Sequence, residues 1–549
     1  MRPRALLAVI ICAGFALRVA CIGSGLPGKS RSLTTYHPDE SITLYSIAAM
    51  EPEKLNFHPG ESFFWGSLYT YAVAGALKAA SAAGYVKERG RDFFEENPGE
   101  ADRLFLAGRA VSAAAGTLTI AFVFMAGKEL FGAPAGLMAA FMTAVSAGAV
   151  MCSVYLKPEP LMLMFCSLSL YWSARILKKN GGRACLWAGL AAGLAAAAKY
   201  NGGVFLIVPV FAALLAGDRR LWQVPLSFLA GFIAGCPYSL LDARAFYNNI
   251  HSIAGMGTQA PPPWNLGLHE GLSGYLSYYL PYAFGWPLAA LLLLSFAWPF
   301  AAGLLNKKGK RSLWPDRTAV FLLVPAAALF ALFASSHRQM VLYGVPLWPL
   351  LFLLAAKACA ELFSAAPGRA AKMAVAAAGC LVGAHALFYS ASYVSLFSGP
   401  NVREEASAWI EANIPADKKI GVTKKYFWTP PALRNLGPGY RVLSFRDDSF
   451  NLREGALSLK ATAAKADYLV LSDFEIRDFL RLPAVYPEEY KALKSVLGAG
   501  FSLEARFEHA PSFLGVKFSK RHPPWDWMYP NPTIYVYRKK APGGAGGRG

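Results

Sequence analysis

The chain has 549 residues, of which 55% are hydrophobic, and its apolar residues come in long runs. Soluble proteins rarely combine this length with this hydrophobicity, so the composition excludes an ordinary soluble fold. The formal net charge of +20 does not indicate nucleic-acid binding, because the lysines and arginines cluster in short segments between the apolar runs. The eight cysteines lie in or beside apolar runs, which argues against a disulfide framework and against a cysteine-based zinc site.

The apolar runs predict a polytopic α-helical membrane domain over residues 1–394 with about eleven transmembrane helices. The first run follows a basic start, but it contains Arg18 and many runs follow it, so we expect an uncleaved span and no signal peptide. The predicted spans are about 5–23, 104–127, 132–150, 160–178, 184–199, 203–216, 222–240, 276–302, 318–334, 341–357 and 373–394.

Four basic loops set the predicted orientation of these spans. When residues 175–183, 217–220, 306–311 and 367–372 are placed inside, the N-terminus also falls inside. Residues 24–103 then form a first external loop. Segment 63–83 within this loop is interpreted as a helix in or near the outer interface, because a further span there would reverse the charge pattern of every later loop.

Residues 395–540 lack the long apolar runs of residues 1–394 and predict a small external α/β domain. A disordered tail is predicted at 541–549. VREEASAWIEAN is typical of an amphipathic helix, and KKIGVT, ADYLVLS and TIYVYRK are typical of strands. The aromatic run HPPWDWMYPNP (522–532) has the composition to stack on sugar rings or lie on lipid, but a loop packed on its own domain is favoured.

Ionisable residues inside or against membrane spans cost free energy, so they mark either a site or a paired structural contact. In the predicted topology most of them gather on the outer side, and nothing comparable occurs on the inner side. The candidates are Arg18, Asp39, Glu40, Arg109, Glu159, Lys199, His337 and Arg338.

Structural roles are open for several of these residues. Arg18 and Arg109 are interpreted first as snorkelling or structurally paired side chains. Lys199 suits the end of a helix and Glu159 suits the start of one, because of the helix dipole. His58 is expected to be a loop histidine. Capping of the helix that begins at SITLYS explains one of the acids in YHPDE (36–40) but not both.

The chain resembles the large integral-membrane glycosyltransferases of the GT-C fold over roughly residues 1–360. The closest subgroup comprises the bacterial relatives of dolichyl-phosphate-mannose protein mannosyltransferases and of aminoarabinose transferases. The resemblance rests on segments that are fairly specific together and weak singly: YHPDE, AGRAVSAAAGT, SVYLKPEPL, AAAAKYNGG and HRQMVLYG.

This resemblance implies transfer of a sugar from a polyprenyl-phosphate carrier to a protein, glycolipid or glycan acceptor outside the cytoplasm, by inverting displacement. It also implies one acid in the first external loop and a second acid, commonly Asp, at the outer start of the fourth span. The second acid is Glu159 here, and its longer side chain leaves its role open.

The predicted roles follow from the needs of this reaction. Asp39 is the predicted general base, and Glu40 assists it by positioning or by binding a metal. Glu159 orients the acceptor or the sugar. Lys199 and Arg338, together with His337, hold the carrier phosphate. The second-rank candidates are Tyr36, His37, His58, Arg109 and Tyr200.

Other functions and partners stay open at this stage. No cofactor is certain, although a divalent metal on Asp39 and Glu40 is an option. A multi-pass transporter with ionisable residues along its substrate path is one alternative, and a non-catalytic glycan- or lipid-binding scaffold is another. The expected location is a bacterial inner membrane with the C-terminal domain outside the cytoplasm.

Overall fold

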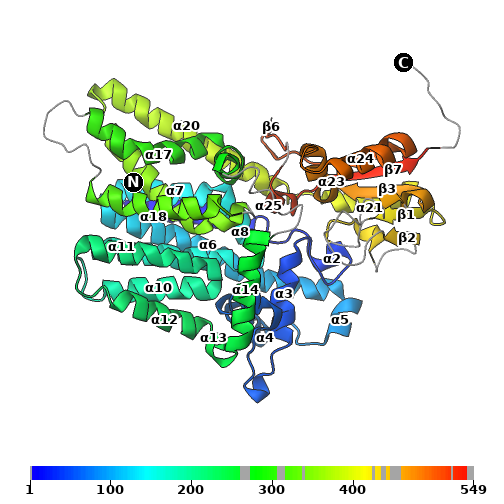
Figure 1. The fold of residues 1–549 in the computed structure, drawn as a ribbon, viewed down its shortest axis with the longest axis horizontal. Coiled ribbons are helices and arrows are strands. Elements are labelled where there is room, and N and C mark those ends of the chain that lie inside the picture. Colours follow the sequence, from blue (N-terminus) through cyan, green and yellow to red (C-terminus); the bar gives the residue numbers. More distant parts are fainter. Residues whose placement is uncertain are drawn as a thin grey trace.

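The computed structural model describes residues 3–259, 272–305, 316–336, 340–422, 427–434, 441–444, 459–460, 462–520 and 523–540. The predicted phosphate-binding residues His337 and Arg338 lie outside this set, as does the tail predicted to be disordered. Figure 1 shows a body of long helices that run side by side, with a smaller domain containing a sheet at one end of them.

Every predicted span coincides with helical structure. Five helices are long and apolar enough to cross a membrane: α6 (Pro98–Phe131), α9 (Glu159–Leu177), α18 (Arg317–Ala334), α19 (Trp348–Ala365) together with the 3-10 turn before it, and α20 (Gly368–Ser395). The shorter helices of the body are α1 (Pro3–Val19), α7 (Ala133–Val145), α8 (Ala147–Val154), α10 (Ala184–Ala198), α11 (Ile207–Ala216), α12 (Gln223–Gly235), α16 (Leu280–Phe284) and α17 (Trp286–Leu305).

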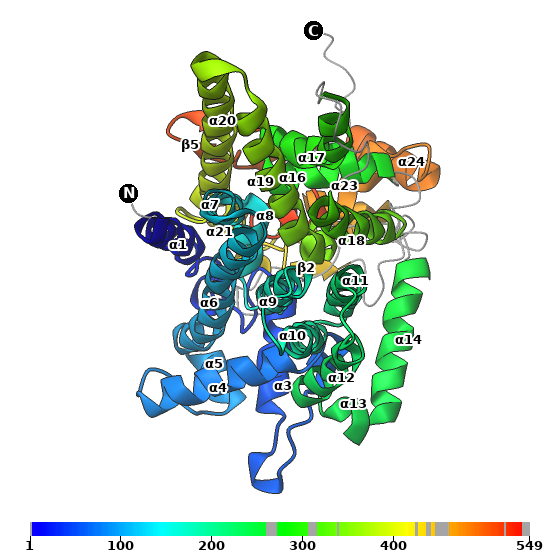
Figure 2. The ribbon, with the colours of Figure 1, turned by 90° about the vertical axis from the view of Figure 1, so that its left-hand side faces the viewer.

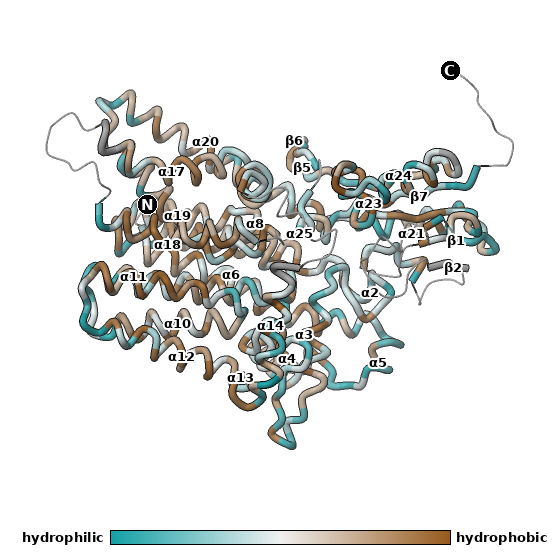
Figure 3. The backbone as a smooth tube through the Cα atoms, in the orientation of Figure 1, coloured by the Kyte–Doolittle hydropathy of each residue, from teal (hydrophilic) through white to brown (hydrophobic). Residues whose placement is uncertain are grey.

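The prediction of a multi-span helical membrane protein is confirmed, and the number eleven stays a prediction. By length and composition the described residues hold five such spans, or six if the bent pair α7 and α8 is one span. Figure 3 shows hydrophobic residues along α10, α11, α12, α18 and α19, and hydrophilic residues at their connections.

The run predicted as one span at 132–150 is divided into two helices. α7 and α8 meet at an angle of 53°. Ser146 between them is extended, and its hydroxyl accepts a hydrogen bond from the backbone N–H of Ala149, which starts a new helix. The segment after α8 is thereby turned toward the start of α9.

Small residues let two of the shorter helices pack closely, as the Ala- and Gly-rich sequence of α10 indicates. A Cβ atom on Gly193 of α10 would lie 2.1 Å from the carbonyl oxygen of Phe228 in α12. A Cβ atom on Gly231 of α12 would lie 2.4 Å from the carbonyl oxygen of Leu190. The backbones of α10 and α12 are therefore in contact.

The first external loop folds over one end of the helical body. It contains α3 (Pro38–Ala48), α4 (Leu68–Ala82) and α5 (Arg91–Glu96). The segment interpreted as an interfacial helix forms α4. Figures 1 and 2 show α4 lying across the direction of the long helices, as does α14 (Ala243–Gln259). The depth of α4 in a bilayer stays a prediction.

The C-terminal domain, which is predicted to be external and is called the external domain below, holds a five-stranded mixed sheet in the order β2-β1-β3-β7-β4. β1 pairs in parallel with β2 and β3, and β7 pairs antiparallel with β3 and β4. α21 (Val402–Asn413) packs on one face of the sheet, while α23 (Asp473–Arg481) and α24 (Pro487–Ser495) pack on the other. The strands are β1 (Lys419–Val422), β2 (Arg441–Ser444), β3 (Tyr468–Ser472), β4 (Phe501–Phe507) and β7 (Ile534–Lys539).

The aromatic run of the external domain does not pack on its own domain alone. It forms the short helix α25 (Trp525–Met528), and Trp527 is buried in the core of the helical body, with its ring 5.7 Å from that of Tyr393. The neighbouring side chains form a second buried cluster that joins both domains: Met340, Phe427, Trp428, Phe474, Trp525, Met528 and Tyr529. We call these seven side chains, together with Trp527, the aromatic joint.

Candidate active site

Asp39 lies in the first turn of α3, close to the external end of the helical body. Pro38 opens the helix, and the Nδ1 atom of His37 accepts a hydrogen bond of 3.3 Å from the backbone N–H of Asp39. An acid is favoured at this position because the unpaired backbone N–H groups at a helix start carry partial positive charge. The Asp39 side chain keeps 32% of its surface exposed.

Four charged side chains form a continuous row that begins at Asp39. The Nζ atom of Lys157 lies 3.2 Å from Oδ2 of Asp39 and 3.6 Å from Oε1 of Glu159. The Nζ atom of Lys199 lies 2.6 Å from the same Glu159 oxygen. We call Asp39, Lys157, Glu159 and Lys199 the charge row. Negative and positive groups alternate along it, so each charge is compensated by a neighbour.

The fold brings the charge row together from three helix ends. Lys157 lies in the turn between α8 and α9, Glu159 is the first residue of α9, and Lys199 directly follows α10. The side chains of Lys157 and Glu159 are almost completely buried, and that of Lys199 is 14% exposed. Asp39 is therefore the most accessible group of the row.

Lys157 was not among the candidates that the sequence analysis selected. It lies within the motif SVYLKPEPL, two residues before Glu159, where a helix start places both side chains on one turn. Burial alone would lower the pKa of Lys157, but the negative charges of Glu159 and Asp39 raise the pKa above its usual value. Lys157 therefore stays charged between the two acids.

Glu40 has a different environment from its neighbour. Its carboxylate is fully buried and accepts two hydrogen bonds of 2.8 Å from the guanidinium of Arg109. It also accepts the hydroxyl of Thr35 and, at 2.7 Å, the backbone N–H of Leu156. A further nitrogen of Arg109 donates to the carbonyl oxygens of Ile22 and Ser24. This pair joins α6, the end of α1 and the turn before α9.

The two acids of YHPDE have different partners. The carboxylate of Glu40 is bound by Arg109, and that of Asp39 faces Lys157. Over the residues that the structure describes, no group of three His, Cys, Asp or Glu side chains is placed to hold a metal ion. The roles predicted for Asp39 and Glu40, including the metal-binding option, stay predictions.

Arg18 is buried among backbone groups. Its guanidinium donates to the carbonyl oxygens of Gly14, Thr143 and Ala144, at 2.7, 3.3 and 3.3 Å respectively. These contacts hold α1 against the end of α7. The structure places Arg18 outside the charge row.

His37 is a direct neighbour of the charge row. Its ring lies between those of Tyr155 and Tyr529, at centroid distances of 4.6 and 4.2 Å, and its Nε2 atom is 3.4 Å from Nζ of Lys157. Burial and the adjacent Lys157 hold the pKa of His37 well below its usual value. His37 is therefore neutral at physiological pH.

The other second-rank candidates lie apart from the row. The hydroxyl of Tyr36 donates to Glu404 in the external domain at 3.1 Å, and the guanidinium of Arg403 lies over its ring. His58 faces Asp242 at 3.6 Å. Tyr200 donates to the carbonyl oxygen of Phe63 at 2.7 Å. These contacts connect the first external loop to the external domain, to the segment before α14 and to the segment after α10.

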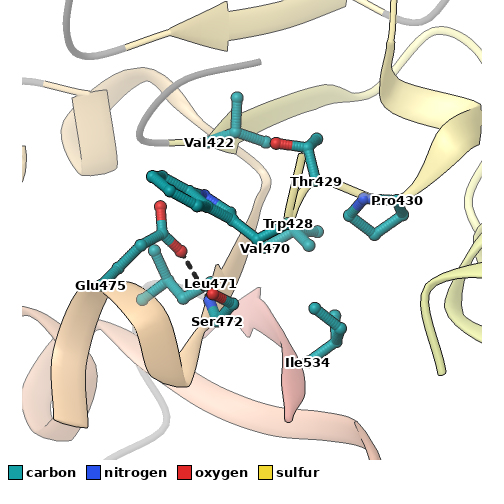
Figure 4. Close-up of a pocket in the computed structure, with 9 residues that line it drawn as sticks. All are labelled: Val422, Trp428, Thr429, Pro430, Val470, Leu471, Ser472, Glu475 and Ile534. Atoms are coloured by element: carbon teal, nitrogen blue, oxygen red, sulfur yellow. Dashed lines mark hydrogen bonds between the residues drawn. The ribbon is translucent and has the colours of Figure 1, made fainter. Parts of the chain in front are cut away.

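A pocket in the external domain is separate from the charge row. It lies where β1 and β3 end and is lined in part by Trp428 and Glu475 (Figure 4). Glu475 accepts a hydrogen bond of 2.6 Å from the backbone N–H of Ser472, and burial raises its pKa to about 8. The ring of Trp428 stacks on Phe474, so the pocket borders the aromatic joint.

Known proteins share parts of this sequence and the fold. Residues 102–239 match the sequence profile of the family described as dolichyl-phosphate-mannose-protein mannosyltransferase. The matched segment contains Arg109, Lys157, Glu159 and Lys199, which confirms the resemblance over that part of the chain. No curated protein matches the chain significantly.

Solved structures of membrane enzymes are similar to the whole chain at low sequence identity. The Archaeoglobus fulgidus oligosaccharyltransferase in its apo form has a TM-score of 0.51 at 13% identity, over 96% of this chain and 77% of that one. ArnT from Cupriavidus metallidurans, bound to undecaprenyl phosphate, has a TM-score of 0.44 at 15% identity, over 99% of both chains. The first similarity establishes a shared fold.

Proposed function

We propose that this chain is a membrane glycosyltransferase that transfers a sugar from a polyprenyl-phosphate carrier to an acceptor. The observation that carries the proposal is the charge row, in which an accessible carboxylate and two lysines meet at one end of the helical body. The family match over residues 102–239 and the fold shared with the oligosaccharyltransferase support it.

In this proposal Asp39 is the general base. The acceptor hydroxyl is a weak nucleophile, so a carboxylate within hydrogen-bond reach takes its proton as the new glycosidic bond forms. The ammonium of Lys157 lies 3.2 Å from the carboxylate of Asp39 and pairs with it at the entrance to the row. Attack opposite the carrier oxygen breaks the bond to the anomeric carbon and inverts the configuration of that carbon.

The leaving group is a lipid phosphate, which departs as a stable anion and requires positive charge nearby. Lys199 is the described cation that we assign to this role, because its side chain is partly exposed at the end of the row. His337 and Arg338 stay predicted partners of the phosphate. Glu159, which holds both lysines, orients them and the sugar.

The position of the row favours an enzyme over a transporter. A transporter that couples ions to a substrate carries its charges near the middle of its spans. Here Glu159 begins α9 and Lys199 follows α10, so the charges lie at helix ends beneath the external domain. In the predicted orientation, this end faces away from the cytoplasm of a bacterial cell. The acceptor class is left to experiment.

The proposal is tested by sugar transfer with purified protein in nanodiscs. Wild type, Asp39→Asn and the control Asp92→Asn, which changes an exposed acid of the same loop, receive a panel of radiolabelled polyprenyl-phosphate sugars with candidate acceptors. We expect release of polyprenyl phosphate from wild type and the control, and a loss of at least about 10²-fold for Asp39→Asn.

Two results would contradict parts of this assignment. Release that survives Asp39→Asn leaves the enzyme in place but moves the base to Glu159. Absence of release from the folded wild-type protein with every donor and acceptor contradicts the glycosyltransferase proposal itself.

A further inference from the structure

The aromatic joint brings one carboxylate of the external domain close to the charge row. Asp526 lies in α25, and its Oδ2 atom accepts a hydrogen bond of 2.9 Å from the backbone N–H of Leu342. Its Oδ1 atom is buried and has no hydrogen-bond partner. A buried carboxylate oxygen without a hydrogen-bond partner is costly, so a positive charge in its surroundings would favour it.

Two contacts locate Asp526 relative to the row. On one side, the ring of Tyr529, three residues later, packs against that of His37, whose Nε2 atom lies 3.4 Å from Nζ of Lys157. On the other side, Leu342 precedes Tyr343, whose ring centroid lies 5.8 Å from Nζ of Lys199. The residues on both sides of the Asp526 carboxylate therefore reach the part of the row that contains the two lysines.

The electrostatics agree with this placement. Burial would lower the pKa of Lys157, but Glu159, Asp39, Tyr529 and Asp526 act in the opposite direction and raise it. In turn, burial raises the pKa of Asp526, and Lys157 is among the groups that oppose this effect. Lys157 thus pairs directly with Asp39 and Glu159, while the charge of Asp526, in the external domain, acts on it from further away.

We propose that Asp526 is a positioning residue of the site, acting on Asp39 through Lys157, so that the external domain supplies part of the active site. The inference rests on the proposed glycosyltransferase function. By sharing Lys157, Asp526 weakens the hold of that lysine on Asp39 and leaves the base available to an incoming hydroxyl. Without this charge, Lys157 pairs more tightly with Asp39.

The first test compares Asp526→Asn with Asp473→Asn. The asparagine keeps an oxygen for the N–H of Leu342 but removes the charge. Asp473 is a matched control, because it is buried in the same domain and has an unpartnered Oδ1 atom, but the cations that act on it are Lys520 and Arg477. We expect Asp526→Asn to lower kcat by about 10- to 100-fold without changing KM for the donor, and the control to retain wild-type values.

The second test measures the energetic coupling between Asp526 and Lys157 and does not depend on sugar transfer. Thermal unfolding of Asp526→Asn, Lys157→Met and the double variant forms a double-mutant cycle, in which we expect non-additive shifts in Tm. Wild-type kcat in Asp526→Asn, a change in KM alone, or additive Tm shifts would overturn the proposal. If wild type itself transfers no sugar, the proposed function fails and the cycle alone decides whether Asp526 acts on Lys157.

Discussion

Asp39 and Glu40 are adjacent in sequence but have opposite environments. The carboxylate of Asp39 is about one-third exposed, and that of Glu40 is buried against Arg109. A buried ion pair loses much more when one partner is removed than an exposed pair does, because the remaining charge stays in a low-dielectric environment. The two residues should therefore respond differently to the same chemical change.

We expect Glu40→Gln to lower the free energy of unfolding by about 3 kcal/mol, because Arg109 then lies buried without a compensating charge. Asp39→Asn is the matched control and should change stability by less than about 1 kcal/mol. Denaturant unfolding in mild detergent measures both. Equal stability of the two variants would contradict the structural role of the Glu40–Arg109 pair.

At this scale the sequence predicts which acids and bases gather, but not how they pair. Asp39, Glu159 and Lys199 were selected because ionisable residues at membrane depth need partners. The pairing of Glu40 with Arg109 spans two helices and the turn before a third, so no local pattern indicates it. Lys157 was overlooked because a lysine in a short turn resembles an ordinary loop residue until its burial is known.

Asp39 is positioned by the first turn of α3, and the residue that caps the N-terminus of this helix is His37. His37 is buried and neutral when folded, with a pKa well below the usual 6.5, and the charged groups that affect it are Lys157, Glu159, Arg109 and Lys199. Below about pH 6.5 the unfolded chain binds a proton at His37 that the folded chain does not. The free energy of unfolding must therefore fall as the pH falls through this range.

We expect His37→Gln to reduce this loss of stability between about pH 6.5 and 5, because glutamine keeps an acceptor for the Asp39 N–H but does not titrate. Each pH unit below the unfolded pKa contributes up to about 1.4 kcal/mol. Thermal unfolding of wild type, His37→Gln and His251→Gln, an exposed histidine of α14, measures the slope. If Tm changes with pH in His37→Gln as it does in wild type, protonation of His37 is not the origin of the loss of stability.

The contact between α10 and α12 places Lys199 at the end of the charge row. We expect Gly193→Ala to destabilise the protein by about 1–3 kcal/mol, because the added methyl group would meet the backbone of Phe228 at 2.1 Å. Gly75→Ala is the control, since Gly75 in α4 has open space around its Cα atom. Alanine there should be neutral or stabilising by up to about 1 kcal/mol. A stable Gly193→Ala variant in thermal unfolding would contradict the close packing.

The elements themselves were largely predictable, because long apolar runs and strand patterns are local signals. The breaks within them were not. The division of 132–150 at Ser146 depends on a hydroxyl that caps a new helix, and serine is common inside apolar runs. The break matters for the site, because the turn after α8 carries Lys157.

At the scale of the whole molecule, the aromatic joint connects the helical body to the external domain. Trp527 belongs to the core of the body, while its neighbours in α25 pack on Phe427, Trp428 and Phe474. The sequence favoured a loop packed on its own domain, since aromatic composition does not reveal which surface a segment covers. The joint is what makes the two domains one structural unit.

We expect Trp527→Ala to cost about 3–5 kcal/mol and to separate the unfolding of the two domains into two calorimetric transitions, because it opens a cavity at their junction. Trp222→Ala removes an indole that is 60% exposed and should keep a single transition. A single, unshifted transition for Trp527→Ala would show that the joint contributes nothing to cooperativity.

The contact between the rings of Tyr529 and His37 also has a consequence for biosynthesis. A ribosome adds residues in order, so the charge row is exposed at the membrane long before Tyr529 and Asp526 are translated. During that interval His37 lacks one of its two aromatic neighbours, and Lys157 lacks the nearby charge of Asp526. A nascent chain would therefore hold an incomplete site, and sugar transfer would begin only after the external domain has been made and has folded back onto the membrane.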